Sequence, residues 1–254
     1  MGLGQQRPVA LVTGGSRGVG AATVLSLAAG GYDVALVYRN KATRAADVAA
    51  EADRAGAATL ALACDITRPE QVAALFARIG DWRGRLDALV LNASGGLERD
   101  LLAADPAYPT RINRDAQLDL LDGALPLLEP GSTVLFVTSH WAHLYGIVKQ
   151  LPAYEPVARS KHAGERALRE RMPELHRRGI RLLVVTGDLI EGTITPKLLD
   201  RAAPGSIAAW RGGSSPLPTA AEMGAAIASA VLDTALPDGS VVVVGNRLES
   251  LRRL

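Results

Sequence analysis

Residues 9–20 read VALVTGGSRGVG, an aliphatic run followed by a glycine-rich turn. The aliphatic run is typical of a buried parallel strand, and the residues after Gly20 are typical of a helix. In this setting Gly14 permits a tight turn, Gly18 lets backbone N–H groups approach an anion, and Gly20 lets the helix pack closely. The positive end of the helix dipole then faces the same point. The stretch therefore predicts a site for the pyrophosphate of a dinucleotide, formed where a strand passes into a helix.

The rest of the chain alternates short strand-like runs with longer alanine-rich segments of helical periodicity. This alternation predicts an α/β, Rossmann-like doubly wound fold, with a seven-stranded parallel sheet and helices on both faces. The predicted strands are Val9–Thr13, Asp33–Tyr38, Thr59–Ala63, Ala88–Asn92, Thr133–Thr138, Leu182–Thr186 and Val241–Val244. The predicted helices are Ala21–Ala29, Arg44–Ala55, Glu70–Ile79, Arg111–Leu128, Ser160–Glu174 and Ala220–Leu232.

Pro and Gly mark the joins between these elements, and no stretch has the composition of a linker between domains. We therefore expect residues 1–254 to form a single domain. One segment, residues 191–217, departs from the regular alternation because Gly, Pro and Ser clusters surround a short apolar piece. It follows the sixth predicted strand, and ligands of such sheets bind beyond the carboxyl ends of the strands. We expect this insertion to form a lid over a substrate.

The composition excludes several classes of function. A net charge of +2, with arginines spread along the chain, does not favour nucleic-acid binding. The chain has one cysteine, Cys64, so neither an intrachain disulfide nor a cysteine-rich metal site is expected. The polar N-terminal segment lacks the apolar core of a signal peptide, and no run is long enough to cross a bilayer. We expect a soluble cytoplasmic protein.

The spacing Thr-Gly-x-x-x-Gly-x-Gly resembles that of the short-chain dehydrogenase/reductase family, and further landmarks extend the resemblance along the chain. The acidic residue Asp65 follows the third predicted strand, and the stretch Asn92-Ala93-Ser94-Gly95 follows the fourth. Gly187 and Thr193 follow the sixth. The resemblance implies a nicotinamide dinucleotide cofactor. It implies that the cofactor is bound by Gly14, Ser16, Arg17, Gly18, Val19, Gly20, Asp65, Ile66, Asn92, Ala93, Ser94, Lys161, Gly187, Ile190 and Thr193.

The end of the second predicted strand indicates which nicotinamide cofactor is bound. An NAD enzyme places a carboxylate there to accept from the ribose 2′-hydroxyl, whereas this chain has Arg39-Asn40-Lys41. Arg39, Lys41 and Arg17 can surround a 2′-phosphate, and a guanidinium is well matched to that dianion. We expect NADPH in preference to NADH.

The family usually carries Tyr-x-x-x-Lys, in which the lysine lowers the pKa of a tyrosine that exchanges a proton with the substrate. Here Lys161 is present, but Val157 stands four residues before it, and the nearest tyrosine is Tyr154. This Tyr-x6-Lys spacing is similar to that of the enoyl-acyl-carrier-protein reductases of the same superfamily. The resemblance also implies catalytic roles for Ser139, at the end of the fifth strand, and for Asn113. Pro156 predicts that Tyr154 projects from a loop ahead of the helix.

The stretch between Ser139 and Val157 is longer than usual in the family and contains His140 and His143. We expect no metal site, because two histidines without a nearby carboxylate are a poor ligand set. Both histidines are interpreted as residues of the pocket wall or of the surface.

The leading hypothesis is an NADPH-dependent oxidoreductase that reduces an activated C=C, such as an enoyl thioester or an enone. One alternative is an NADPH-dependent ketoreductase, and another is a non-catalytic NADP(H)-binding sensor or partner protein. We expect the substrate to be a small or carrier-bound molecule. The family resemblance implies a homo-oligomer, a tetramer or a dimer, and residues 239–254 resemble the segment that often contributes to its contacts.

Overall fold

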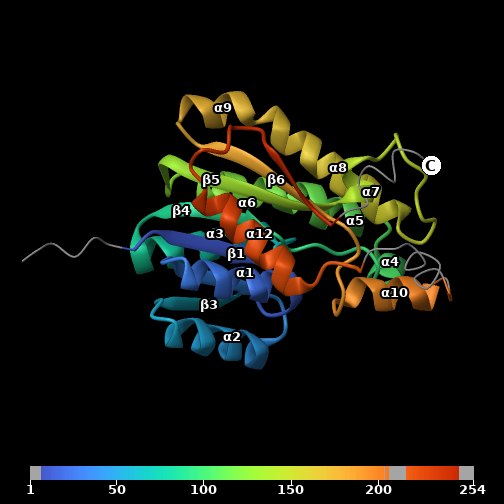
Figure 1. Cartoon of the computed structure of the whole chain (residues 1–254), viewed down its shortest axis with the longest axis horizontal. Coiled ribbons are helices and arrows are strands. Elements are labelled where there is room, and N and C mark those ends of the chain that lie inside the picture. The colour runs from blue at the N-terminus through green and yellow to red at the C-terminus, as the bar shows by residue number, and fades with distance from the viewer. Residues whose placement is uncertain (1–6, 203, 206–215, 246–254) are drawn as a thin grey trace, which may run out of the picture.

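The computed structural model describes residues 7–202, 204–205 and 216–245. Seven strands form one sheet in the order β3-β2-β1-β4-β5-β6-β7 (Figure 1). The strands are β1 Val9–Thr13, β2 Asp33–Tyr38, β3 Thr59–Ala63, β4 Leu86–Leu91, β5 Leu128–Ser139, β6 Arg181–Gly187 and β7 Val241–Val244. Every neighbouring pair is parallel. The predicted seven-stranded parallel sheet is therefore confirmed.

Helices cover both faces of the sheet, as the doubly wound fold requires (Figure 1). Successive β1 side chains alternate between two cores: Leu11 packs with α3, α6 and α8, whereas Val12 packs with α1, α2 and α12. On the first face are α3 Pro69–Arg83, α6 Ala116–Ala124 and α8 Glu155–Glu170, and on the second α1 Gly18–Ala29, α2 Ala42–Arg54 and α12 Ala220–Leu232. The other α-helices of the described residues are α4 Arg99–Ala104, α5 Tyr108–Thr110, α7 His140–His143, α9 Met172–Arg177 and α10 Ile194–Ala202.

Two helix predictions need correction. The helix predicted over Arg111–Leu128 begins with a π-helical turn, η1 Arg111–Asp115, and ends at Ala124, while Leu128 already belongs to β5. The helix predicted over Ser160–Glu174 is divided between two helices: α8 begins at Glu155, with Pro156 in its first turn, and ends at Glu170, and α9 begins at Met172. The N–H that proline lacks would have no partner inside the helix at that position, so proline is tolerated there.

The strand order places the binding edge of the sheet. The chain moves outward from β1 to β2 and β3 and then returns to β4 on the other side of β1. Such a reversal leaves a crevice beyond the carboxyl ends of β1 and β4. None of the helices in the described part of the chain combines the length and hydropathy that a bilayer crossing requires.

Candidate active site

A cleft of about 760 Å³ lies along the carboxyl edge of the sheet. All the residues predicted to bind a cofactor line it, and so do Ser139 and Tyr154. They come from the carboxyl ends of six neighbouring strands, β3 to β6, and the loops after them, and from the first turn of α1 and the start of α8. Asn113 is the exception among the predicted site residues, because it lies behind the cleft wall and is buried.

The glycine-rich turn has the geometry of an anion cradle. Gly14 and Gly18 have φ angles of 69° and 54°, a left-handed conformation that side chains other than glycine rarely adopt. A Cβ on Gly20 would lie 2.2 Å from the carbonyl oxygen of Gly14, so only glycine fits there. Helix α1 begins at Gly18 without a side-chain cap, which leaves its first N–H groups facing the cleft.

The loop after β4 is bonded directly to the end of β1. The buried Thr13 hydroxyl accepts from the backbone N–H groups of Asn92 and Ala93, both at 2.9 Å. The Asn92 side-chain amide donates to the carbonyl of Thr13 at 2.8 Å. These bonds fix the floor of the cleft at the crevice between β1 and β4.

Positive charge gathers at one end of the cleft, beyond β2. Arg17, Arg39 and Lys41 are all exposed and line this end. Asp65 also lines the cleft there, but its Oδ1 accepts from the hydroxyl and the backbone N–H of Thr67, at 2.6 and 3.0 Å. This end is therefore suited to a phosphate dianion.

At the opposite end, Tyr154 and Ser139 are joined by a hydrogen bond. The Tyr154 hydroxyl donates to Ser139 Oγ at 3.0 Å. Tyr154 lies in the turn immediately before α8, and its ring meets Trp141 edge to face with 5.9 Å between the centroids. Burial raises the pKa of the Tyr154 phenol, and the hydrogen bond with Ser139 partly opposes that rise. The phenol is thus protonated at neutral pH and held at the carboxyl end of β5.

Lys161 reaches the same end of the cleft from the second turn of α8. Its side chain is buried, and desolvation lowers its pKa to about 8. Val157, where the family's usual tyrosine stands, also lines the cleft, and its methyl group would lie 3.2 Å from a Cβ on Gly96. An apolar side chain therefore occupies the position from which the usual phenol would project.

Asn113 connects three segments behind this end of the cleft. Its amide donates to Gly95 O at 2.9 Å and to Ser160 Oγ at 3.0 Å, and its Oδ1 accepts from Gly95 N. It lies within the π-helical turn η1, which is packed so closely against α8 that a Cβ on Gly164 would lie 2.0 Å from Asn113 O. Asn113 holds the β4 loop and α8 in a fixed relation.

The interpretation of the two histidines is wrong in two respects. His140 does not line the cleft in the described structure; it is completely buried, with Nδ1 3.0 Å from Thr186 Oγ1. His143 does have a nearby carboxylate, because its Nδ1 lies 3.0 Å from both oxygens of Glu165, which also accepts from Arg169. Glu165 lies 22 residues further along the chain, so sequence proximity gave no sign of the pair.

Several cleft residues were not predicted, among them Glu98, Tyr108, Asp188 and Met223. Tyr108 belongs to a three-residue helix that no periodicity marks. The predicted lid is only partly described: Ile194, Thr195, Lys197 and Leu198 of α10 line the cleft, whereas residues 206–215 lie outside the described residues.

A sequence profile of the short chain dehydrogenase family matches residues 8–202. The 1-cyclohexenylcarbonyl-CoA reductase of Streptomyces collinus is 30% identical over 192 residues, which are 73% of this chain and 66% of that enzyme. The 3-oxoacyl-[acyl-carrier-protein] reductase of Synechocystis sp. is 42% identical over 94 residues, 37% of each chain. The chain thus spans less than two thirds of either relative.

Solved structures share the whole architecture. A short chain dehydrogenase from Burkholderia cenocepacia J2315, solved in complex with NADP, superposes with a TM-score of 0.80 at 27% identity. The superposition covers 94% of this chain and 96% of that one.

Proposed function

Because the chain belongs to the short chain dehydrogenase family, and is thus an oxidoreductase that uses a nicotinamide cofactor, we propose that it reduces an activated C=C with NADPH. The substrate class is an enoyl thioester or a related enone. The observation that carries the proposal is the position of the phenol: Tyr154 lies just before α8, seven residues before Lys161, and Val157 lines the cleft where the usual phenol would project.

The cradle formed by the glycine-rich turn fits a dinucleotide, since Gly14 and Gly18 need positive φ angles and no Cβ fits on Gly20. NADPH is the cofactor: Arg17, Arg39 and Lys41 line the end of the cleft where the adenosine 2′-phosphate binds. The NADP complex of the Burkholderia relative supports the same choice. NADH lacks the 2′-phosphate, so it forms weaker ionic and hydrogen-bond contacts with these three side chains.

Each polar residue at the other end has a role in this proposal. Bound NADPH supplies the hydride, which adds to the carbon of the C=C far from the carbonyl, so negative charge develops on the carbonyl oxygen. Ser139 and Tyr154 orient that oxygen, and the Tyr154 phenol donates its hydrogen bond and then its proton to it, which gives an enol. The enol becomes the saturated product when its hydroxyl proton is replaced by one on the carbon next to the carbonyl. Lys161 would hold the nicotinamide ribose hydroxyls, while Asn92 and Asn113 keep the loops in place.

The position of Tyr154 favours C=C reduction over carbonyl reduction. The usual family tyrosine projects from one turn into the helix, whereas Tyr154 lies just outside it and Val157 fills the usual place. A phenol displaced in this way is suited to an oxygen that is separated by two carbon atoms from the carbon that receives hydride. The name of the Streptomyces relative, a reductase of a cyclohexenyl thioester, is consistent with this chemistry.

A ketoreductase is the second candidate, because the Synechocystis relative is a 3-oxoacyl reductase and Tyr154 retains its bond to Ser139. Family membership disfavours the third candidate, the non-catalytic sensor. The test is NADPH oxidation with a 2-enoyl thioester and with the 3-oxoacyl thioester of the same chain length. We expect turnover of the enoyl substrate at least about 100-fold faster, the usual scale of one well-placed proton donor. Faster reduction of the 3-oxo substrate contradicts the proposal.

We also propose that the chain assembles into dimers or tetramers. Apolar side chains at the β7 edge support this: Val243 is 43% exposed and Leu232, at the end of α12, is 44% exposed. Of the predicted contact segment, residues 246–254 lie outside the described residues. Sedimentation velocity of the purified protein tests the proposal, and a monomer at micromolar concentration contradicts it.

A further inference from the structure

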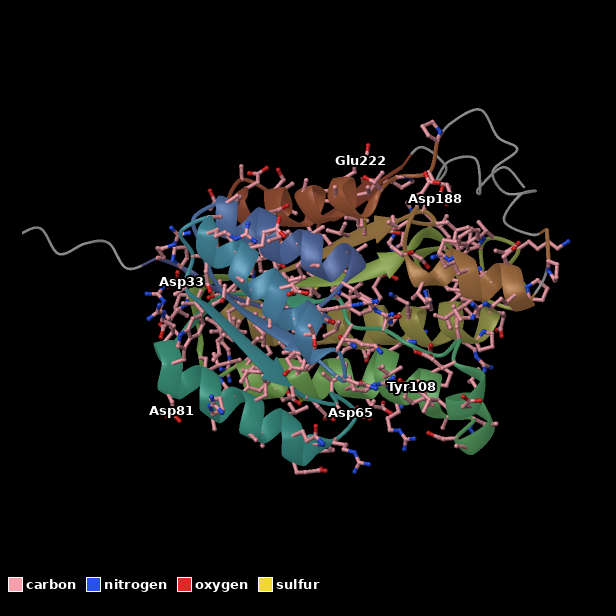
Figure 2. The ribbon with its side chains drawn as sticks, turned by 90° about the horizontal axis from the view of Figure 1, so that it is seen from below. Asp33, Asp65, Asp81, Tyr108, Asp188 and Glu222 are labelled. Carbon is pink, nitrogen blue, oxygen red and sulfur yellow. The ribbon has the colours of Figure 1, made fainter. Side chains whose placement is uncertain are left out.

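At the end of the cleft where Arg17, Arg39 and Lys41 lie, a hydrogen bond joins two residues that are 69 positions apart in the sequence. Arg39 follows β2, and Tyr108 begins α5 on the far side of the cleft. One terminal nitrogen of the Arg39 guanidinium donates to the Tyr108 hydroxyl at 2.9 Å. Figure 2 shows Tyr108 near Asp65, toward the end of the sheet opposite Asp33. The bond therefore lies where the loops after β2 and β3 meet the wall formed by α5.

Tyr108 is a rigid partner in this pair. Its side chain is only 6% exposed and packs in the core with Ile112. The hydroxyl lies 3.0 Å from where a Cβ on Gly95 would stand, so the β4 loop confines the ring. Burial and the charge of Glu98 raise the pKa of the phenol, although Arg39 opposes the rise. Tyr108 thus presents a neutral oxygen at a fixed point of the wall.

Arg39 is, by contrast, an exposed side chain on a loop, and such a side chain loses much rotamer freedom when it binds a ligand. Its Nε donates to Asn40 Oδ1 at 3.2 Å, and one terminal nitrogen donates to Tyr108. A guanidinium has five N–H donors, so the second terminal nitrogen is left for a phosphate. The two bonds fix the plane of the guanidinium before any ligand arrives.

We propose that Tyr108 is a positioning residue that holds Arg39 ready for the 2′-phosphate and thereby sets the preference for NADPH over NADH. This inference depends on the proposed NADPH cofactor but not on the proposed substrate. A preorganised Arg39 binds the phosphate without first losing its own freedom. Among the described residues, no side chain holds Arg17 or Lys41 in the way that Tyr108 holds Arg39, so their contributions are independent of Tyr108.

The test measures dissociation constants of NADPH, NADH, 2′,5′-ADP and 5′-ADP for the full chain and four variants. The variants are Tyr108→Phe, Arg39→Ala, the double variant and Tyr32→Phe. Tyr32 is a matched control because it packs with the second core and does not line the cleft. We expect Tyr108→Phe to weaken NADPH and 2′,5′-ADP by about three- to ten-fold, the range expected when one rotamer-rich side chain must be immobilised on binding. NADH and 5′-ADP should change by less than about twofold, since neither carries a 2′-phosphate.

The double variant separates positioning from packing. If Tyr108 acts through Arg39, then Tyr108→Phe has no further effect on NADPH binding once Arg39 is alanine. Equal weakening of NADPH and NADH, or a full additional loss in the Arg39→Ala background, overturns the inference. An unchanged NADPH affinity in Tyr108→Phe overturns it as well. In that case, weaker NADPH binding by Arg39→Ala would still support NADPH as the cofactor. A wild-type protein with no preference for NADPH over NADH contradicts both the proposed cofactor and the role of Tyr108.

Discussion

Tyr154 and Val157 stand one helical turn apart at the start of α8 and present opposite chemistry to the cleft. Tyr154 offers a protonated phenol bonded to Ser139, and Val157 offers only methyl groups. The spacing of Tyr154 and Lys161 could be read from the sequence. The bond to Ser139 could not, because it depends on how α7 carries the chain between the two residues.

His140 shows how burial of a single residue affects stability. Its side chain is fully buried, and burial, followed by the neighbouring His143, lowers its pKa to about 4 from an ordinary value of 6.5. The unfolded state therefore takes up a proton first as the pH falls. The stabilisation is fully present above pH 6.5 and is lost between pH 6.5 and about 4.

From this difference we predict that His140 makes the free energy of unfolding fall by about 2 kcal/mol between pH 7 and pH 5. Urea unfolding of His140→Asn should show a pH dependence smaller by that amount. His176→Asn is the control, since the His176 side chain is 80% exposed and should behave as wild type. An unchanged pH dependence in His140→Asn would sink the prediction.

Among the elements, the contact between α8 and η1 is the tightest helix packing beside the cleft. A Cβ on Gly164 would lie 2.0 Å from Asn113 O, and neither backbone can move without displacing Lys161 or the β4 loop. We predict that Gly164→Ala lowers the free energy of unfolding by about 2 to 3 kcal/mol, the usual cost of overpacking.

The matched control is Gly80→Ala in α3, where the nearest atom to the added Cβ is 3.9 Å away, on Leu127. Alanine is the better helix former, so this variant should be up to about 1 kcal/mol more stable than wild type. Urea unfolding of both variants checks the pair. Equal stability of the two variants is incompatible with the packing described.

The strands were the best predicted elements. The bounds of β1, β2, β3 and β7 agree with the sequence pattern because each strand is a continuous, mainly apolar run. β1 and β2 are buried, whereas β3 and β7 lie at the edges of the sheet and are partly exposed. Helix ends were predicted less well, as Pro156 shows. The helices α4, α5 and α7 were not predicted because three to six residues are too few to show a helical period. Helix α10 was not predicted because it lies in the segment that was interpreted as an irregular lid.

At the scale of the whole molecule, one cleft crosses the carboxyl edge from β3 to β6. The landmarks predicted from the sequence meet there because the strand order brings together loops far apart in the chain. The hydrogen-bonded pairs Arg39–Tyr108 and His143–Glu165 each join residues from different elements, so neither could be predicted from spacing along the sequence. The cleft has cations at one end and a buried phenol and lysine at the other, as the proposed NADPH-dependent reduction requires.

The most direct test of this account is the effect of Tyr154→Phe on turnover and on cofactor binding, measured on the same preparation. The variant keeps the ring against Trp141 and removes only the hydroxyl that is bonded to Ser139. With an enoyl thioester and NADPH, we predict that kcat falls by about 100-fold or more, while the Kd for NADPH stays within about twofold. A Tyr154→Phe enzyme with nearly wild-type kcat would contradict the central claim.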